Sequence, residues 1–84
     1  MAKYALVNNF NATSDTFGTI ISRHKSIDAA NKADDAYQRA VKRANGSTSY
    51  IPTVVVERTV GDRVARGSYA PRSQYRAVDR YGDE

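Results

Sequence analysis

The chain has 84 residues, no cysteine and a formal net charge of +4. This length allows one small domain without a separate catalytic lobe, and the missing cysteine excludes a disulfide framework and any thiolate metal ligand or nucleophile. No apolar run approaches the roughly 18 residues that span a bilayer, and the N-terminus lacks a secretory signal. We therefore expect a soluble, cytoplasmic protein with no membrane contact.

Two strands are predicted before the first helix. Residues 3–8 are apolar on both faces, which is typical of a strand that lies inside a sheet or is covered on both sides. Residues 8–15 are rich in Asn, Ser, Thr and Asp, a composition that indicates a loop. The alternation over residues 17–23 predicts a second strand, and we expect the two strands to form an antiparallel hairpin.

The pattern of apolar and charged residues over residues 26–46 predicts an amphipathic helix. Ser26 is a suitable N-cap, and Asn45-Gly46 supplies the stop signal. The acidic residues come early and the basic residues come late, an order that complements the helix dipole. At about 100° per residue, one arc of roughly 140° holds eight small or apolar residues. They are Ala29, Ala30, Ala33, Ala36, Tyr37, Ala40, Val41 and Ala44. The six alanines predict close packing of the helix on a sheet.

Residues 50–59 predict a third strand centred on three consecutive valines. Pro52 implies either an edge position or a ladder that begins after it. Gly61-Asp62 is typical of a tight hairpin turn, which makes residues 63–69 a fourth strand with Glu57 opposite Arg66. The predicted fold of residues 1–70 is therefore α+β. One helix packs on one face of an antiparallel sheet of three to four strands, in the order ββαβ or ββαββ.

Residues 71–84 are predicted to form a basic tail rich in Arg and Tyr. Arg72, Arg76 and Arg80 recur every four residues, so a helix over residues 73–81 would align them in one stripe. A helix this short with few apolar contacts frays when it is alone. We expect residues 71–84 to be disordered, or helical only under particular conditions.

No catalytic, metal or cofactor site is predicted. His24 is the only histidine and stands between Arg23 and Lys25, which indicates a solvated turn residue without the partner that a general base needs. Asp34 and Asp35 are adjacent, but neighbours on a helix point about 100° apart and cannot act as a carboxylate dyad. No serine has the context of an activated nucleophile. We therefore expect a protein that is not an enzyme.

The arginines indicate a binding function. Residues 58–80 hold six arginines and two acids, whereas residues 1–57 hold seven basic and five acidic residues. Arginine forms forked contacts with phosphate or carboxylate, and tyrosine stacks on bases. We predict a small binding module that engages nucleic acid or a nucleoprotein through this C-terminal third. The candidate partner-binding residues are Arg58, Arg63, Arg66, Arg72, Tyr75, Arg76, Arg80 and Tyr81.

Other interpretations of the same residues stay open. The arginines are also typical of a charged segment that keeps a small protein dispersed. An acidic protein surface rewards arginine beside an aromatic ring as well, so the chain fits a phage- or mobile-element-encoded inhibitor or adaptor that blocks a host machine. A third strand that is apolar on both faces needs cover on both, which favours a homodimer or a structural homo-oligomer.

Overall fold

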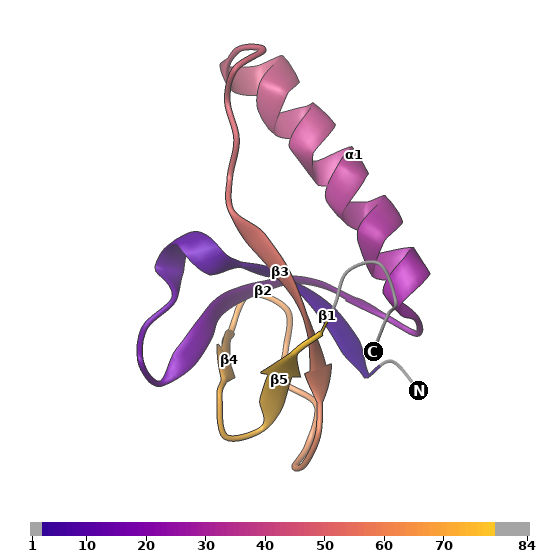
Figure 1. Cartoon of the computed structure of the whole chain (residues 1–84), viewed down its shortest axis with the longest axis vertical. Helices are drawn as coiled ribbons and strands as arrows, with labels where there is room; N and C mark the ends of the chain where they lie inside the picture. Colours follow the sequence, from indigo (N-terminus) through magenta and orange to yellow (C-terminus); the bar gives the residue numbers. More distant parts are fainter. Residues whose placement is uncertain (1–2, 79–84) are drawn as a thin grey trace.

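The computed structural model of the protein describes residues 3–78. They form an α+β fold in which one α-helix and one short 3-10 helix accompany a five-stranded antiparallel sheet (Figure 1). The elements are β1 (Tyr4–Asn8), η1 (Asn9–Asn11), β2 (Thr16–His24), α1 (Ile27–Asn45), β3 (Thr53–Arg58), β4 (Tyr69–Pro71) and β5 (Tyr75–Ala77). The predicted class and the hairpin of β1 and β2 are confirmed. The sheet has more strands than the three to four predicted.

The sheet curls and brings its two edges near each other. The strand order is β4-β2-β1-β3-β5, so β4 and β5 stand at opposite edges, yet only residues 72–74 separate them in the chain. A connection this short spans about 14 Å at most, whereas the outer strands of a flat five-stranded sheet lie about 19 Å apart. Figure 1 shows β4 and β5 side by side below the central strands. The curl gives the sheet an inner and an outer face.

Each face of the sheet carries its own apolar core. On the inner face, Val7, Phe17, Ile20, Val56 and Tyr75 pack together with two buried alanines. On the outer face, residues of β1 and β3 pack against the N-terminal half of α1. The same chain therefore covers both faces of β3, and the apolar character of that strand no longer requires a second copy.

The bounds and caps of α1 agree with the prediction. The Ser26 hydroxyl accepts the backbone N–H of Ala29 at 3.1 Å, and Gly46 closes the helix with a φ of 115°. The predicted buried face is only partly correct, because Ala36, Ala40 and Ala44 are exposed. The buried residues Ala30, Asp34 and Val41 form a narrower stripe than predicted, and the last turns of α1 also run past the end of the sheet (Figure 1).

Polar side chains join α1 to the segment that leads into β3. The Thr53 hydroxyl donates to the carboxylate of Asp34 at 2.7 Å. The Gln38 amide donates to the carbonyl of Ile51 at 2.7 Å and accepts its N–H at 3.3 Å, as a neighbouring strand would. The ladder of β3 thus begins after Pro52, which agrees with one of the two options that the proline left open.

The C-terminal third departs from the prediction. Residues 63–68 are irregular rather than a strand, and Glu57 lies opposite Arg76, not Arg66. A helix over residues 73–81 is wrong for the described part, because residues 75–77 form β5. Tyr75 is only 4% exposed in the inner core, so packing outweighs the helical spacing of the arginines. Residues 79–84 lie outside the described residues.

Candidate functional site

The structure divides the eight predicted partner-binding residues into different groups. Tyr75 is a core residue and is not available to a partner, which corrects its predicted role. Arg80 and Tyr81 lie outside the described residues. The five remaining arginines differ in what surrounds them, and this difference locates the candidate site.

Arg72 is held by the loop between η1 and β2. Its guanidinium carbon lies 4.4 Å from the centre of the Phe17 ring, a distance at which a cation and an aromatic face attract each other. Its Nε donates to the carbonyl of Thr13 at 2.9 Å, and its backbone N–H donates to the carbonyl of Asp15 at 2.9 Å. We therefore interpret Arg72 as a structural residue.

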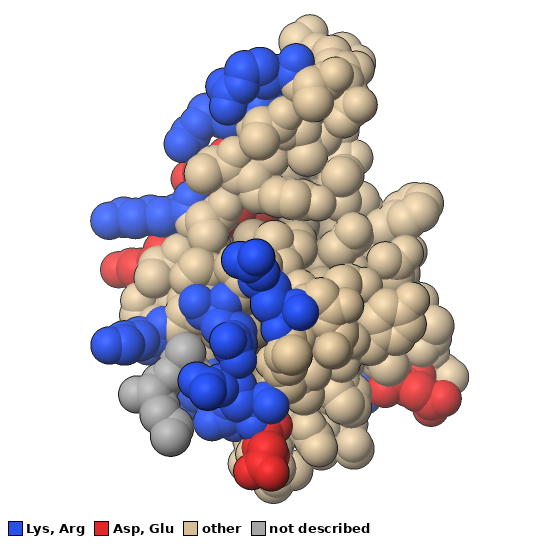
Figure 2. Space-filling view, turned by 180° about the vertical axis from the view of Figure 1, so that it is seen from behind, with Lys and Arg blue, Asp and Glu red and all other residues tan. Residues whose placement is uncertain are grey.

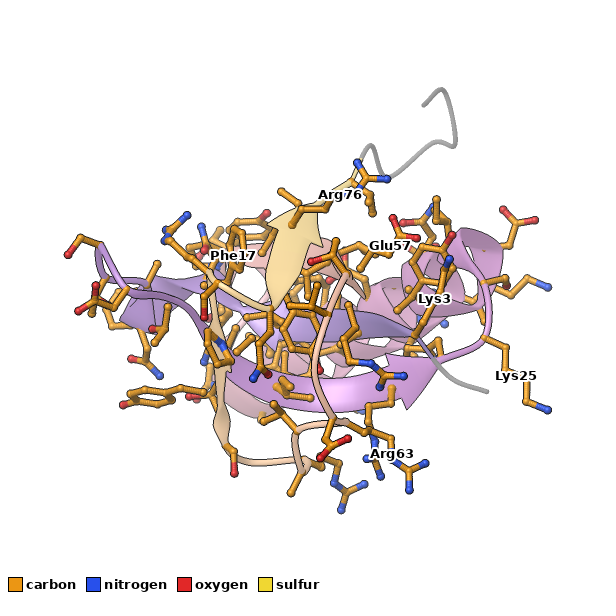
Figure 3. All side chains as sticks on the ribbon, turned by 90° about the horizontal axis from the view of Figure 1, so that it is seen from below. Lys3, Phe17, Lys25, Glu57, Arg63 and Arg76 are labelled. Carbon is orange, nitrogen blue, oxygen red and sulfur yellow. The ribbon has the colours of Figure 1, made fainter. Side chains whose placement is uncertain are left out.

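Arg76 is paired with Glu57 on the neighbouring strand. Its Nη2 lies 2.6 Å from Oε1 of Glu57, while Nζ of Lys3 lies 2.8 Å from Oε2 (Figure 3). The hydrogen bond from Lys3 and the two positive charges hold the pKa of Glu57 below its usual value, although burial opposes them. The same carboxylate raises the pKa of Lys3. Arg76 thus already has a carboxylate partner within the protein.

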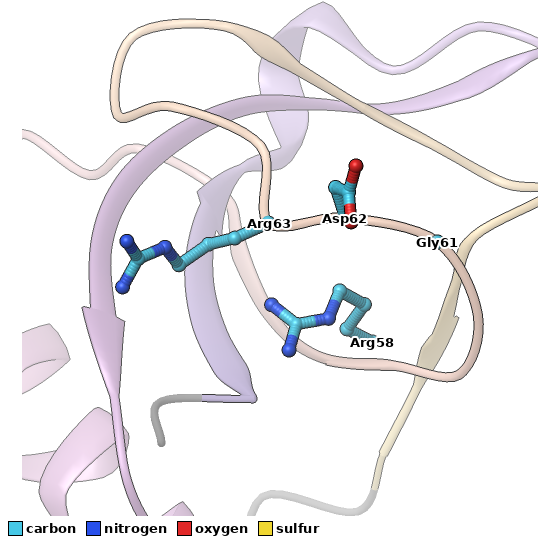
Figure 4. Close-up of a pocket in the computed structure, with 4 residues that line it drawn as sticks. All are labelled: Arg58, Gly61, Asp62 and Arg63. Carbon is cyan, nitrogen blue, oxygen red and sulfur yellow. The ribbon is translucent and has the colours of Figure 1, made fainter.

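Arg58, Arg63 and Arg66 have no ion pair within the described residues. Arg58 and Arg63 line an open pocket of about 390 Å³ together with Gly61 and Asp62. Figure 4 shows both guanidinium groups extending to the same side, while the Asp62 carboxylate points elsewhere. Figure 3 places Arg63 on the opposite side of the molecule from Arg76 and Glu57.

Arg66 lies beside β2. The next residue, Gly67, donates its N–H to the carbonyl of Ile20 at 2.9 Å, and the N–H of Ile20 donates to the carbonyl of Ser68 at 2.9 Å. These bonds fix the chain on either side of Gly67 along the edge of β2. Arg66, whose side chain is exposed, therefore lies in a segment alongside β2, the strand whose end carries Arg23.

Arg23 is a member of this group that the sequence did not indicate. It lies opposite Ala5, which lies opposite Val56, so all three share one face of the sheet. Arg58 follows Val56 by two residues and shares that face, and the strands of Arg23 and Arg58 are about 10 Å apart. Only the pairing register reveals this proximity. We call Arg23, Arg58, Arg63 and Arg66 the arginine surface. Figure 2 shows Lys and Arg side chains grouped on the lower part of the molecule, seen from behind the view of Figure 1.

The described residues contain few groups suited to other chemistry. No three His, Cys, Asp or Glu side chains within residues 3–78 are close enough to share a metal ion. His24 is not a solvated turn residue as predicted: it ends β2, its Nε2 lies 2.6 Å from the Ser22 hydroxyl, and partial burial lowers its pKa. In the same part of the chain, α1 is too polar to cross a membrane.

Comparison with known proteins gives no functional assignment. No protein family matches the sequence, and no curated protein or solved structure is significantly similar to it. The chemistry of the arginine surface is therefore the basis for a functional hypothesis.

Proposed function

We propose that this protein is a non-enzymatic module that binds nucleic acid through the arginine surface. The observation that carries the proposal is the contrast between two kinds of arginine. Arg72 and Arg76 are engaged by Phe17 and Glu57, whereas no ion pair within the described residues engages the four arginines of the arginine surface. An arginine without a counterion is available for a forked contact with a phosphate group.

A polyanion suits this surface better than an acidic protein does. Stable protein interfaces have an apolar centre that excludes water, but the pocket between Arg58 and Arg63 is lined by charged residues and glycine alone. The most exposed aromatic residues are Phe10, Tyr50 and Tyr69, and they are not part of that lining. The lining of this pocket therefore offers charge without an apolar side chain, which is typical of contacts to a sugar–phosphate backbone.

The proposal predicts a defined salt dependence. Each phosphate that a protein neutralises on duplex DNA contributes about −0.9 to the slope of log association constant against log salt concentration. Four arginine contacts therefore give a slope of about −3.6. Contacts to phosphates position a protein without reading bases, so affinity is expected to vary little with base sequence.

Fluorescence anisotropy with labelled oligonucleotides tests the proposal. The wild-type chain and the variant Arg58→Gln/Arg63→Gln/Arg66→Gln are titrated into duplex DNA, single-stranded DNA and RNA of equal length over a salt series. We expect the wild-type chain to bind, and we expect the slope of the variant on duplex DNA to be shallower by about 2.7. Circular dichroism shows whether the variant keeps its fold.

Two results would contradict the proposal. The first is that the wild-type chain binds none of the polymers at low salt, which would direct the search to an acidic protein partner. The second is that a folded variant binds with the wild-type slope, since the contacts would then lie elsewhere on the molecule.

A further inference from the structure

Residues 59–68, here called the arginine loop, are fastened at both ends. At the first end, the carbonyl of Gln74 accepts the N–H of Thr59 at 2.7 Å, the hydroxyl of Thr59 at 3.1 Å and the N–H of Val60 at 3.4 Å. At the second end, the hydrogen bonds of Gly67 and Ser68 with Ile20 join the loop to β2. The loop therefore has little freedom where it leaves and rejoins the sheet.

Two contacts hold the middle of the arginine loop in place, one made by Val64 of the loop and one made by Gln74. Val64 is half-buried and packs against the inner core, which anchors the residue next to Arg63. Gly61 has a φ of +78°, and a Cβ atom there would lie 2.9 Å from Nε2 and 3.0 Å from Cδ of Gln74. The side chain of Gln74 thus lies directly against the backbone that forms one wall of the arginine pocket.

Gln74 supports the loop by packing. Its Oε1 is buried and accepts no hydrogen bond within the described residues. The contact with Gly61 therefore depends on the volume of the side chain more than on its amide. Because Gly61 lies between Arg58 and Arg63, the position of its backbone sets how the two guanidinium groups face a ligand (Figure 4).

We infer that the arginine loop is preformed for phosphate binding and that Gln74 is its positioning residue. The inference rests on the proposed function. A loop that is already ordered loses less conformational entropy when it binds, and this raises affinity without adding a contact. Removing the support should weaken binding while all arginine–phosphate contacts are still made in the complex.

The test compares Gln74→Ala with Gln74→Met in the full chain, using the same duplex DNA and salt series. Alanine removes the support, whereas methionine keeps a flexible side chain of similar length and lacks the buried polar atom. We expect Gln74→Ala to bind about five- to tenfold more weakly at a fixed salt concentration with the wild-type salt slope. Gln74→Met should bind within about twofold of the wild type.

The outcomes separate the inference from the proposed function. Wild-type binding with no loss in Gln74→Ala overturns the inference and leaves the proposed function standing, as does an equal loss in both Gln74 variants. Absence of wild-type binding overturns both. If Gln74→Ala fails to fold, Gly61→Ala supplies the second test. Alanine is strained at the φ of +78°, and its Cβ meets the end of the Gln74 side chain, so the contact between the loop and Gln74 is disturbed and binding should weaken at an unchanged slope.

Discussion

Individual charged residues of this protein have different tasks that depend on their neighbours. Glu57 lies on β3 between Lys3 and Arg76 and joins the start of β1 to β5. The side chain of Glu57 is 12% exposed, whereas both cations are more than half exposed. Solvent therefore screens each pair, but the shared carboxylate links three neighbouring strands.

The stability that Glu57 contributes should depend on pH. The hydrogen bond from Lys3 lowers the pKa of Glu57 below its usual 4.5, so the folded state binds this proton more weakly than the unfolded state. The contribution is therefore present above pH 4.5 and is lost as the pH falls through the lowered pKa. We expect Glu57→Gln to melt a few degrees below the wild type at pH 7.

A melting series from pH 7 to pH 2 checks this prediction, with Asp35→Asn as the control. Asp35 is an exposed residue of α1 and its substitution makes the same change in net charge. The gap between the wild type and Glu57→Gln should close at acid pH. A gap of constant size, or an equal gap for the control, would contradict the role of the carboxylate.

Substitutions at two glycines distinguish the effect of a steric collision from that of backbone strain. Gly18 in β2 has a φ of +123°, and a Cβ atom there would collide with the carbonyl oxygen of Asn8 on β1. Gly67 has a φ of +90° with no atom within 4 Å of the same position. We expect Gly18→Ala to cost about 3 kcal/mol or more, or to prevent folding, and Gly67→Ala to cost about 1–2 kcal/mol. Urea denaturation measures both, and equal losses would refute the collision at Gly18.

At the scale of elements, the short strands β4 and β5 complete the fold. The inner core draws Ala70 from β4 and Tyr75 from β5, and both are buried. Each strand has only three residues, so its place depends on the partner strand and the core more than on local propensity.

A chain that ends at Ala70 should therefore not fold cooperatively, although the sequence suggests a domain boundary there. It loses β5 and Tyr75, and removal of a large buried aromatic residue costs about 3–5 kcal/mol, a large part of the stability of a small domain. A chain that ends at Val78 keeps every described strand. Thermal unfolding followed by circular dichroism should show a sharp transition for the longer chain only. A sharp transition in the shorter chain would contradict the role of β5.

How far the sequence predicts this fold depends on the range of the interactions involved. The ends of α1 follow from Ser26 and Gly46, since capping is a local effect. The strand β5 does not follow from the sequence. The four-residue spacing of the arginines is typical of a helix, and only the contact of Tyr75 with the core identifies the strand. The sequence predicts part of the arginine surface. Its charge excess is visible in the sequence, but the inclusion of Arg23 requires the register of β1, β2 and β3.

At the scale of the whole molecule, seven of the 13 basic residues lie in two regions with different surroundings. The exposed residues Arg39, Lys42 and Arg43 lie on α1, where the helix runs past the sheet. The arginine surface instead gathers its cations from β2, β3 and the arginine loop. If binding depends on this arrangement, cations on α1 should matter much less than those of the arginine surface.

The most direct test of the account is the salt slope of binding to duplex DNA in two matched triple variants. Arg58→Gln/Arg63→Gln/Arg66→Gln and Arg39→Gln/Lys42→Gln/Arg43→Gln each remove three positive charges from exposed or half-exposed positions. We predict that the first variant loses about 2.7 from the magnitude of the slope and that the second keeps the wild-type slope. An equal loss in the two variants would show that net charge, not the arginine surface, accounts for binding.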